Sequence, residues 1–325
     1  MGKLFILLLT LCLSGPVAMA QQFEQYSLFG LNRYAYNPAY GGMAGGLQAT
    51  ALHRAQWGGL DGAPTTNHFN VHLPVYAVSG GFGCSFTAEE IGAWTRWSLG
   101  GSWAQHIAIG RNAILSAAIS GRILQRSLNG FVLRAPEGVY EDGEVVHNDG
   151  LLSDQLQSGT AFSVGAGTFL QAGAFEAGMA LTSINRPVYS FSGQAGLPFQ
   201  EASHLFIHAG YAFNPSESVE ILPIILVKSD MVIQQFDFSL QMTLAGTFFV
   251  GGGYRGWNAD SSDAALAFGG IRLPSGLNIA YCYDIPLSDL KVAQDGSHEI
   301  LLSWTLGSPI GKGRPPRILY HPRFL

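Results

Sequence analysis

The feature of this sequence that most limits its fold is a regular alternation of apolar and polar residues, combined with the lack of a long apolar segment. In the last predicted strand, for example, Ile300 and Leu302 alternate with Glu299 and Ser303. A period of two residues is typical of β-strands with one apolar and one polar face. A transmembrane helix needs about 20 consecutive apolar residues, and no segment after residue 20 provides them. The chain is therefore predicted to be all-β.

The composition indicates a membrane protein. Of the 325 residues, 47% are hydrophobic and only 12% are charged, whereas about 25% are charged in an average soluble domain. In lipid every backbone N–H and C=O group must be paired within the protein. An apolar chain without a spanning helix can satisfy this condition as a closed barrel. We therefore predict a transmembrane antiparallel β-barrel in the outer membrane of a Gram-negative bacterium, in contact with outer-membrane lipid.

The alternation predicts about fourteen strands, an even number as in most bacterial single-chain barrels. They are expected at residues 47–55, 66–75, 78–88, 95–107, 112–124, 160–171, 173–183, 204–213, 217–228, 231–243, 246–255, 262–272, 276–284 and 297–306. Short turns and long connections mostly alternate, and the long ones include residues 125–159, 184–203 and 286–296. Short periplasmic turns and longer extracellular loops are expected of such barrels, and we expect a polar, wet lumen.

The barrel is predicted over residues 47–306, and three segments fall outside it. Residues 1–20 have the features of a signal peptide that is removed, with Ala18-Met19-Ala20 as the cleavage site. Residues 21–46 are aromatic and glycine-rich and either plug the lumen or sit beneath it in the periplasm. Residues 307–325 form a basic tail, expected in the periplasm because an even number of strands returns the chain to its starting side.

No group of residues indicates catalysis, a cofactor or a metal site, and we expect a protein that is not an enzyme. Ser297, His298 and Glu299 include the residue types of a hydrolase triad, but consecutive strand residues point to opposite faces and cannot converge. Four histidines fall in neighbouring strands without a cysteine or carboxylate at ligand spacing, at positions 53, 68, 72 and 106. The net charge of −5 provides no basic surface for nucleic acid.

Three motifs lie outside the general barrel pattern. They are Asn37-Pro38-Ala39-Tyr40-Gly41-Gly42, the segment from Arg54-Ala55-Gln56-Trp57 to Gly62-Ala63-Pro64, and Gly296-Ser297-His298-Glu299-Ile300. Together they closely resemble the PorP/SprF family of Bacteroidetes outer-membrane proteins. In that family an N-P-A-Y/F-x-G element follows the mature N-terminus, an R-x-Q-W-x-x-x-x-G-A-P element crosses the first outer loop, and a G-S/T-H-E-I-like element begins the last strand. The resemblance covers essentially the whole mature chain.

The resemblance implies a part in the type IX secretion system, which carries proteins with a C-terminal sorting domain across the outer membrane. Family members are associated with periplasmic components of that system, or with delivery and surface retention of adhesins, including those of gliding motility. The implied partners are therefore type IX periplasmic components, a secreted substrate with a sorting domain, or both. We expect action through protein–protein contacts; the alternative is a porin or a substrate-specific channel.

Candidate residues for contact with partners lie in the motifs and in the tail. They are Asn37, Pro38, Tyr40, Trp57, Asp61, Pro64, Arg314, Arg317 and Arg323. Trp57 is either an aromatic anchor for a secreted partner or part of the aromatic belt at the membrane surface. The basic tail is either a docking element for periplasmic components or a signal for barrel insertion.

Overall fold

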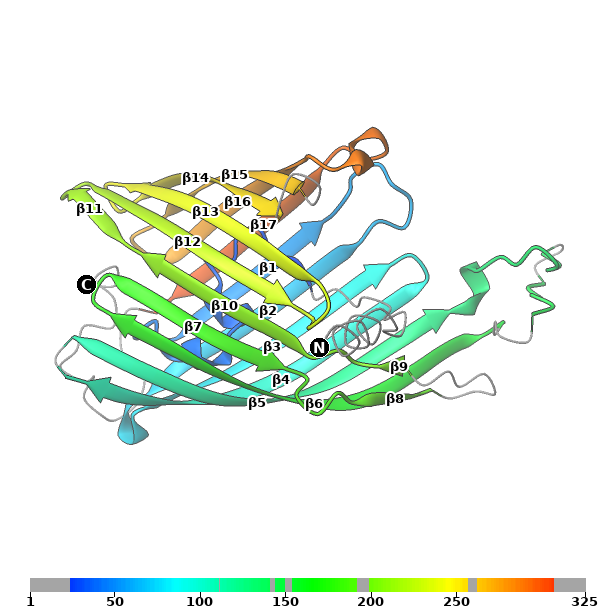
Figure 1. Cartoon of the computed structure of the whole chain (residues 1–325), viewed down its shortest axis with the longest axis horizontal. Helices are drawn as coiled ribbons and strands as arrows, with labels where there is room; N and C mark the ends of the chain where they lie inside the picture. The colour runs from blue at the N-terminus through cyan, green and yellow to red at the C-terminus, as the bar shows by residue number, and fades with distance from the viewer. Residues whose placement is uncertain are drawn as a thin grey trace, which may run out of the picture.

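The computed structural model describes residues 24–110, 112–140, 144–149, 154–191, 199–256 and 262–306. They form a closed antiparallel barrel of 14 strands (Figure 1). The wall consists of β1 (Gln48–Ala55), β2 (Thr65–Val75), β3 (Gly80–Ile91), β4 (Trp94–Ile109), β5 (Ala113–Asn129), β6 (Leu156–Ala172), β7 (Phe175–Thr182), β10 (His204–Tyr211), β12 (Val219–Ser229), β13 (Gln234–Leu244), β14 (Phe248–Gly256), β15 (Ser262–Arg272), β16 (Leu277–Pro286) and β17 (Ser297–Thr305). The barrel closes where β1 pairs with β17.

Short elements complete the structure. Strands β8 (Val188–Phe191) and β9 (Phe199–Gln200) extend the sheet beside β6, and β11 (Phe213–Ser216) pairs with β12. The 3-10 helices are η1 (Arg33–Ala35), η2 (Pro38–Tyr40), η3 (Tyr76–Val78), η4 (Gly130–Val132) and η6 (Asp289–Val292). Among the described residues, no helix is long and apolar enough to cross a membrane.

The predicted barrel is confirmed, and each predicted strand corresponds to a wall strand in the same order. Short turns lie at one end, such as the two-residue turn between β6 and β7, where Gly173 adopts a φ of 58°. The opposite end, called the outer end below, carries the longer connections, together with short ones at residues 92–93 and 230–233. Residues 1–20 and 307–325, predicted as signal peptide and tail, lie outside the described residues.

The largest differences from the predicted boundaries lie at the outer end. Strand β5 continues to Asn129 and β6 begins at Leu156, so the connection predicted at residues 125–159 is shorter. The connection predicted at residues 184–203 contains β8 and β9. The physical reason is that the outward face of β5 and β6 becomes polar near this end, at Gln125 and Thr160. The apolar alternation therefore stops before the hydrogen-bonded sheet does.

The two faces of the wall alternate as predicted, but the lumen face is not polar throughout. In β17, Ile300, Leu302 and Trp304 point outward and are 41–47% exposed, whereas Glu299 is buried on the lumen side. The lumen side also carries large apolar residues, including Leu301, which is fully buried. Alternation alone could not show that apolar residues also face the lumen. Leu301 faces the lumen and Leu302 faces outward, so the residue type does not distinguish the two faces at this point.

Candidate functional site

Residues 24–46, called the plug below, run through the barrel from its outer end to its short-turn end (dark blue in Figure 1). At the outer end Glu24 pairs with Arg96, near the start of β4, at 3.4 Å. At the short-turn end Arg33 pairs with Glu176, near the start of β7, at 2.5 Å. Most plug side chains are buried. The plug therefore occupies the lumen along its length.

The Asn-Pro-Ala-Tyr motif forms a tight turn inside the barrel. The Asn37 side-chain oxygen accepts a hydrogen bond from the Ala39 N–H at 3.0 Å and so caps η2, with Pro38 as its first residue. The Asn37 amide nitrogen donates to the Thr168 carbonyl of β6 at 2.9 Å. One side chain thus fixes the turn and joins it to the wall.

A row of alternating charges, called the charge ladder below, lies along one side of the outer half of the plug. Its successive members are 2.7–3.0 Å apart and lie on β12, β13, β14, β16, β1 and β17. In order they are Lys228, Asp237, Arg255, Asp284, Arg54 and Glu299. Three cations and three anions leave the ladder neutral. This pairing is required, because an unpaired charge in a buried site carries a large desolvation penalty.

The hydroxyl of Ser27 connects the plug to the middle of the ladder. It donates to Asp284 at 2.8 Å and accepts from Arg54 at 2.8 Å and from Arg255 at 2.9 Å. All four groups are buried. Hydrogen bonds to charged partners contribute about 1.5–3 kcal/mol each, so this small plug residue has a large share in holding the segment.

Glu299 binds the plug through its backbone. Its two carboxylate oxygens accept from the N–H groups of Ser27 and Leu28, each at 2.8 Å, while one of them also accepts from Arg54 at 3.0 Å. Arg54 belongs to the first-loop motif and Glu299 to the last-strand motif. Two of the three motifs therefore meet at one point, where they hold the plug that carries the third.

A second ion cluster links the plug to the outer connection between β7 and β10. Arg96 contacts Glu201 at 3.0 Å in addition to Glu24, and Arg126 contacts Glu201 at 3.6 Å. The Tyr189 hydroxyl of β8 donates to Glu201 at 2.8 Å. Burial raises the pKa of Glu201, but Arg96 and Arg126 outweigh burial and hold it below its ordinary value. Glu201 is therefore ionised and binds the outer connection to the wall.

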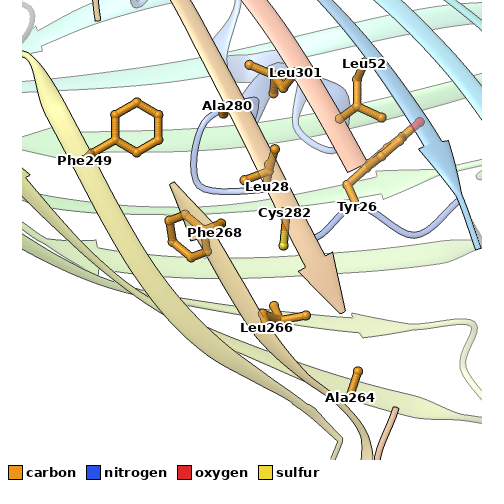
Figure 2. Close-up of a cluster of buried hydrophobic side chains, with 10 residues drawn as sticks. All are labelled: Tyr26, Leu28, Leu52, Phe249, Ala264, Leu266, Phe268, Ala280, Cys282 and Leu301. Atoms are coloured by element: carbon orange, nitrogen blue, oxygen red, sulfur yellow. The ribbon is translucent and has the colours of Figure 1, made fainter. Parts of the chain in front are cut away.

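Apolar packing adds to these charges (Figure 2). Tyr26 and Leu28 of the plug lie against lumen-facing side chains of five strands, and Figure 2 shows these groups pointing toward one another. The wall members are Leu52, Phe249, Ala264, Leu266, Phe268, Ala280, Cys282 and Leu301. Full burial of a large apolar side chain contributes about 1.5–3 kcal/mol. This part of the lumen is a protein core and not an aqueous channel wall.

Glycines on the wall make room for the plug on the opposite side. A Cβ atom on Gly83 would lie 2.5 Å from the Cζ of Tyr34, and one on Gly178 would lie 2.7 Å from the Asn37 amide nitrogen. Gly101 differs, since a Cβ there would meet only a backbone oxygen at 4.0 Å. The plug and the wall are thus complementary in shape. A side chain at Gly83 would clash with the plug, and one at Gly178 would clash with both the plug and the neighbouring wall.

The packing is less complete between the plug and β3–β5. A partly open cavity there has room for water-sized groups and is lined by Tyr36, Ser102, Arg122 and Thr182 among others. Within the described residues, the buried hydroxyls of Tyr36 and Thr182 have no hydrogen-bond partner. Polar cavities of this kind have room for ordered solvent.

The first outer loop is fixed to its neighbours. Gly58 donates to the Gly296 carbonyl and accepts from the Asp295 N–H, both at 2.7 Å. Trp57 has a φ of 50°, a conformation disfavoured for its side chain, and its N–H donates to the Ser297 hydroxyl at 3.2 Å. The loop is therefore a rigid platform at the outer end.

The predicted contact residues fall into three groups. Asn37, Pro38 and Tyr40 lie inside the barrel, and the Tyr40 ring packs against Phe169 at 5.2 Å. In the first outer loop Asp61 is exposed, Trp57 is partly buried and Pro64 is buried. The predicted tail residues lie outside the described part of the chain: Arg314, Arg317 and Arg323. The first group is therefore placed to contact the barrel wall. Of the three groups, the residues of the first outer loop are the ones that the structure places at an outer surface.

The histidines are divided between the two faces. His68, His72 and His106 point into the lumen, whereas His53 points outward and contacts Asn67 at 2.8 Å. Within the residues that the structure describes, no group of three or more His, Cys, Asp or Glu side chains is placed to hold a metal ion.

Sequence reasoning missed most members of the charge ladder. A signal was present, since Asp237 stands between Phe236 and Phe238, and Arg255 follows a glycine-rich apolar run. An isolated charge on the lumen side of an apolar strand requires a partner. The partner itself could not be named, because Asp284 is distant in sequence and two strands away in the wall.

Comparison with solved structures finds other outer-membrane barrels at low identity. The Ralstonia pickettii toluene transporter TbuX has 10% identity and a TM-score of 0.49, with 88% of this chain and 95% of that chain covered. The Acinetobacter baumannii outer membrane protein Omp33 has 8% identity and a TM-score of 0.47, with 80% and 98% covered. These likenesses are confined to the barrel fold. No curated protein gives a significant match.

A protein-family model provides the specific match. The model of the type IX secretion system membrane protein PorP/SprF matches residues 18–304. This range contains the plug, every wall strand up to residue 304 of β17, and all three motifs. The chain is an outer-membrane β-barrel and belongs to the PorP/SprF family of type IX secretion system membrane proteins.

Proposed function

We propose that this protein is an occluded outer-membrane scaffold of type IX secretion. In this role it supports export of a secreted protein or gliding-type adhesin, its attachment to the surface, or both, through protein–protein contacts. The observation that carries the proposal is the filled lumen, in which Ser27 and Leu28 are bound by the charge ladder and Arg33 by Glu176.

The energetics of the plug favour a scaffold over the alternative, a porin or substrate-specific channel. An open lumen would require the plug to leave, which would break the Arg33–Glu176 pair and the bonds to Glu299. Breaking one buried ion pair by removing a partner costs about 3–5 kcal/mol. Departure of the plug would also expose apolar wall residues such as Phe249 and Leu301 to water. An open state is therefore strongly disfavoured.

The partners in this proposal are type IX periplasmic components and a secreted substrate with a C-terminal sorting domain. The first outer loop, with exposed Leu60 and Asp61 on a rigid backbone, is the proposed surface for the secreted partner. The basic tail, with Arg314, Arg317 and Arg323, is the proposed periplasmic contact. Charge complementarity at such surfaces gives specificity and a fast association rate.

Conductance in planar bilayers tests the occluded state. We expect the wild-type protein to be silent. Gly83→Leu must displace Tyr34 and is expected to produce openings, whereas Gly101→Leu adds the same atoms where no plug residue lies and should remain silent. A steady open conductance of the wild-type protein would contradict the proposal and support a porin.

Surface delivery of the dependent secreted protein tests the role in secretion. In a strain that lacks the chromosomal copy, we expect Asp61→Lys to reduce delivery at unchanged barrel abundance. Asp289→Lys is the matched control, because it makes the same charge change at another exposed outer site. Normal delivery in the complete absence of the protein would exclude a part in export or attachment.

A further inference from the structure

The outer turn of the β12–β13 hairpin is unusually apolar. Met231, Val232 and Ile233 are 58%, 66% and 49% exposed, and they follow one another at the tip of the hairpin. Three consecutive exposed apolar residues are unfavourable in water. Either lipid or another protein must cover them, and three observations distinguish these possibilities.

The first observation is the height of the apolar band on this hairpin. Its outward side chains are apolar from Val219 to Val227 on β12 and from Phe236 to Leu244 on β13. At about 3.3 Å per residue and a tilt of about 40°, these roughly eight residue steps span about 20 Å. The apolar band of an outer-membrane barrel is about 25 Å tall. The next outward row, Ser229–Gln234, is polar, and the apolar turn follows directly after it. The hairpin reaches the height of the band only if this turn is included.

The second observation concerns the backbone of the turn. Asp230 accepts hydrogen bonds from the N–H groups of Val232 at 3.0 Å and Ile233 at 2.7 Å. The Met231 N–H donates to the Ser229 hydroxyl at 3.0 Å, and the Asp230 N–H donates to the Ile233 carbonyl at 3.3 Å. Every N–H of the turn is thus satisfied by the hairpin itself. Lipid imposes this requirement, because it offers no hydrogen-bond partner.

The third observation is the contrast with the wall formed by β4–β6. There the outward row Leu99–Ile123–Phe162 is apolar and 45–56% exposed, and the next row toward the outer end is Trp97–Gln125–Thr160. On β5 the apolar side chains from Ala113 to Ile123 cover roughly ten steps, or about 25 Å, and fill the band without a turn. These strands then continue beyond the band, whereas the β12–β13 hairpin ends well short of them (Figure 1).

We propose that the turn Asp230–Ile233 is inserted in the outer leaflet of the membrane and that the outer rim of the barrel is stepped. Lipid covers Met231, Val232 and Ile233, which lie beyond the single polar row Ser229–Gln234. The outer ends of β4–β6, in another part of the barrel wall, extend beyond the membrane. The rim of the barrel is therefore lower at the β12–β13 hairpin than at β4–β6. At the hairpin, the outer end of the lumen faces the membrane surface.

The step affects access to the plug. Gln25 contacts Gln235 at 2.8 Å and Lys228 at 3.2 Å, so the lumen side of the same hairpin holds the outer end of the plug. A partner that lies along the membrane surface can therefore approach the outer end of the plug across the β12–β13 hairpin. The inference rests on the wall alone and does not depend on the proposed function.

Site-directed labelling in phosphatidylcholine vesicles tests the inserted turn. Val232→Cys and Val139→Cys are made in a Cys84→Ser background, since Cys282 is fully buried. Val139 is the matched control, because it is 47% exposed in the connection that extends from β5 and β6. With a nitroxide label, position 232 should collide more with oxygen than with a water-soluble nickel chelate, and position 139 should show the reverse.

A second readout avoids any effect of the label itself. A hydrophilic maleimide should react with the thiol of the Val232→Cys variant about tenfold more slowly than with that of the Val139→Cys variant, because the thiolate forms poorly in an apolar environment. Equal nickel accessibility and equal maleimide rates at both positions would overturn the proposal and place the turn in water. Protection of position 232 from both oxygen and nickel would also overturn it, because protein and not lipid would then cover the turn.

Discussion

Arg54 of the first strand and Glu299 of the last strand are direct cross-strand neighbours, joined by an ion pair of 3.0 Å across the seam that closes the barrel. Their side chains are 2% and 0% exposed. The pair is part of the charge ladder and also binds Ser27, whose N–H donates to Glu299 and whose hydroxyl accepts from Arg54. Closure of the wall and seating of the plug therefore depend on the same two residues.

We expect Glu299→Gln to destabilise the barrel by about 3–5 kcal/mol, because it leaves Arg54 short of a buried partner and weakens the hold on the plug. The measurement is the temperature at which the barrel loses its compact mobility in cold detergent gels. Arg186→Gln is the control, since Arg186 is exposed and should be replaceable without effect. An unchanged transition in Glu299→Gln would mean that the seam pair contributes no stability.

The outward face of β17 gives a second prediction. Leu302 lies near the middle of the strand and is 45% exposed to the exterior, so Leu302→Arg should cost about 2–4 kcal/mol and lower the amount of assembled barrel. His298→Arg lies on the same face at the outer end and should cost about 0–1 kcal/mol. Equal losses would show that this face does not contact lipid. Ser303→Arg is not a neutral control, since Ser303 is buried against the filled lumen.

The low pKa of Glu201 leads to a prediction about pH. A carboxyl whose folded pKa is depressed stabilises the folded state fully above its ordinary pKa of 4.5 and loses this contribution as the pH falls below it. Glu201→Gln should therefore lower the unfolding temperature at pH 7, by the equivalent of about 1.5–3 kcal/mol. The difference from the wild type should shrink below pH 4.5. Glu137→Gln, at an exposed outer position, should change nothing at either pH. A difference that persists in acid would show that packing and not charge is lost.

The basic tail can be tested by deletion of Pro315 to Leu325. We expect the barrel to insert at normal abundance while the dependent protein no longer reaches the surface, since the deletion removes Arg317 and Arg323, two of the four basic residues that favour contact with an acidic periplasmic partner. The two measurements are the amount of heat-modifiable barrel and the amount of surface-exposed secreted protein. A parallel fall of both would identify the tail as an insertion signal, and no change in either would exclude both roles.

Much of the wall could be predicted from the sequence because alternation is local. The period of two in β17, or in β13 around Phe236 and Phe238, follows from the geometry of a strand between lipid and lumen. The same locality explains the errors. Alternation marks the apolar part of β5 but not its continuation to Asn129, where the outward residues become polar.

The sequence by itself determined the barrel, the number and order of its strands and the family, since these depend on strand periodicity and on short motifs. Only the tertiary structure decided what the lumen holds. Arg54, Asp284 and Glu299 meet because of strand register and closure, across as many as 245 positions of sequence. The path of the plug is fixed by shape as well as by charge, through the missing side chain of Gly83 and the ring of Tyr34. Such contacts are set by the packing of distant segments, and no local pattern contains them.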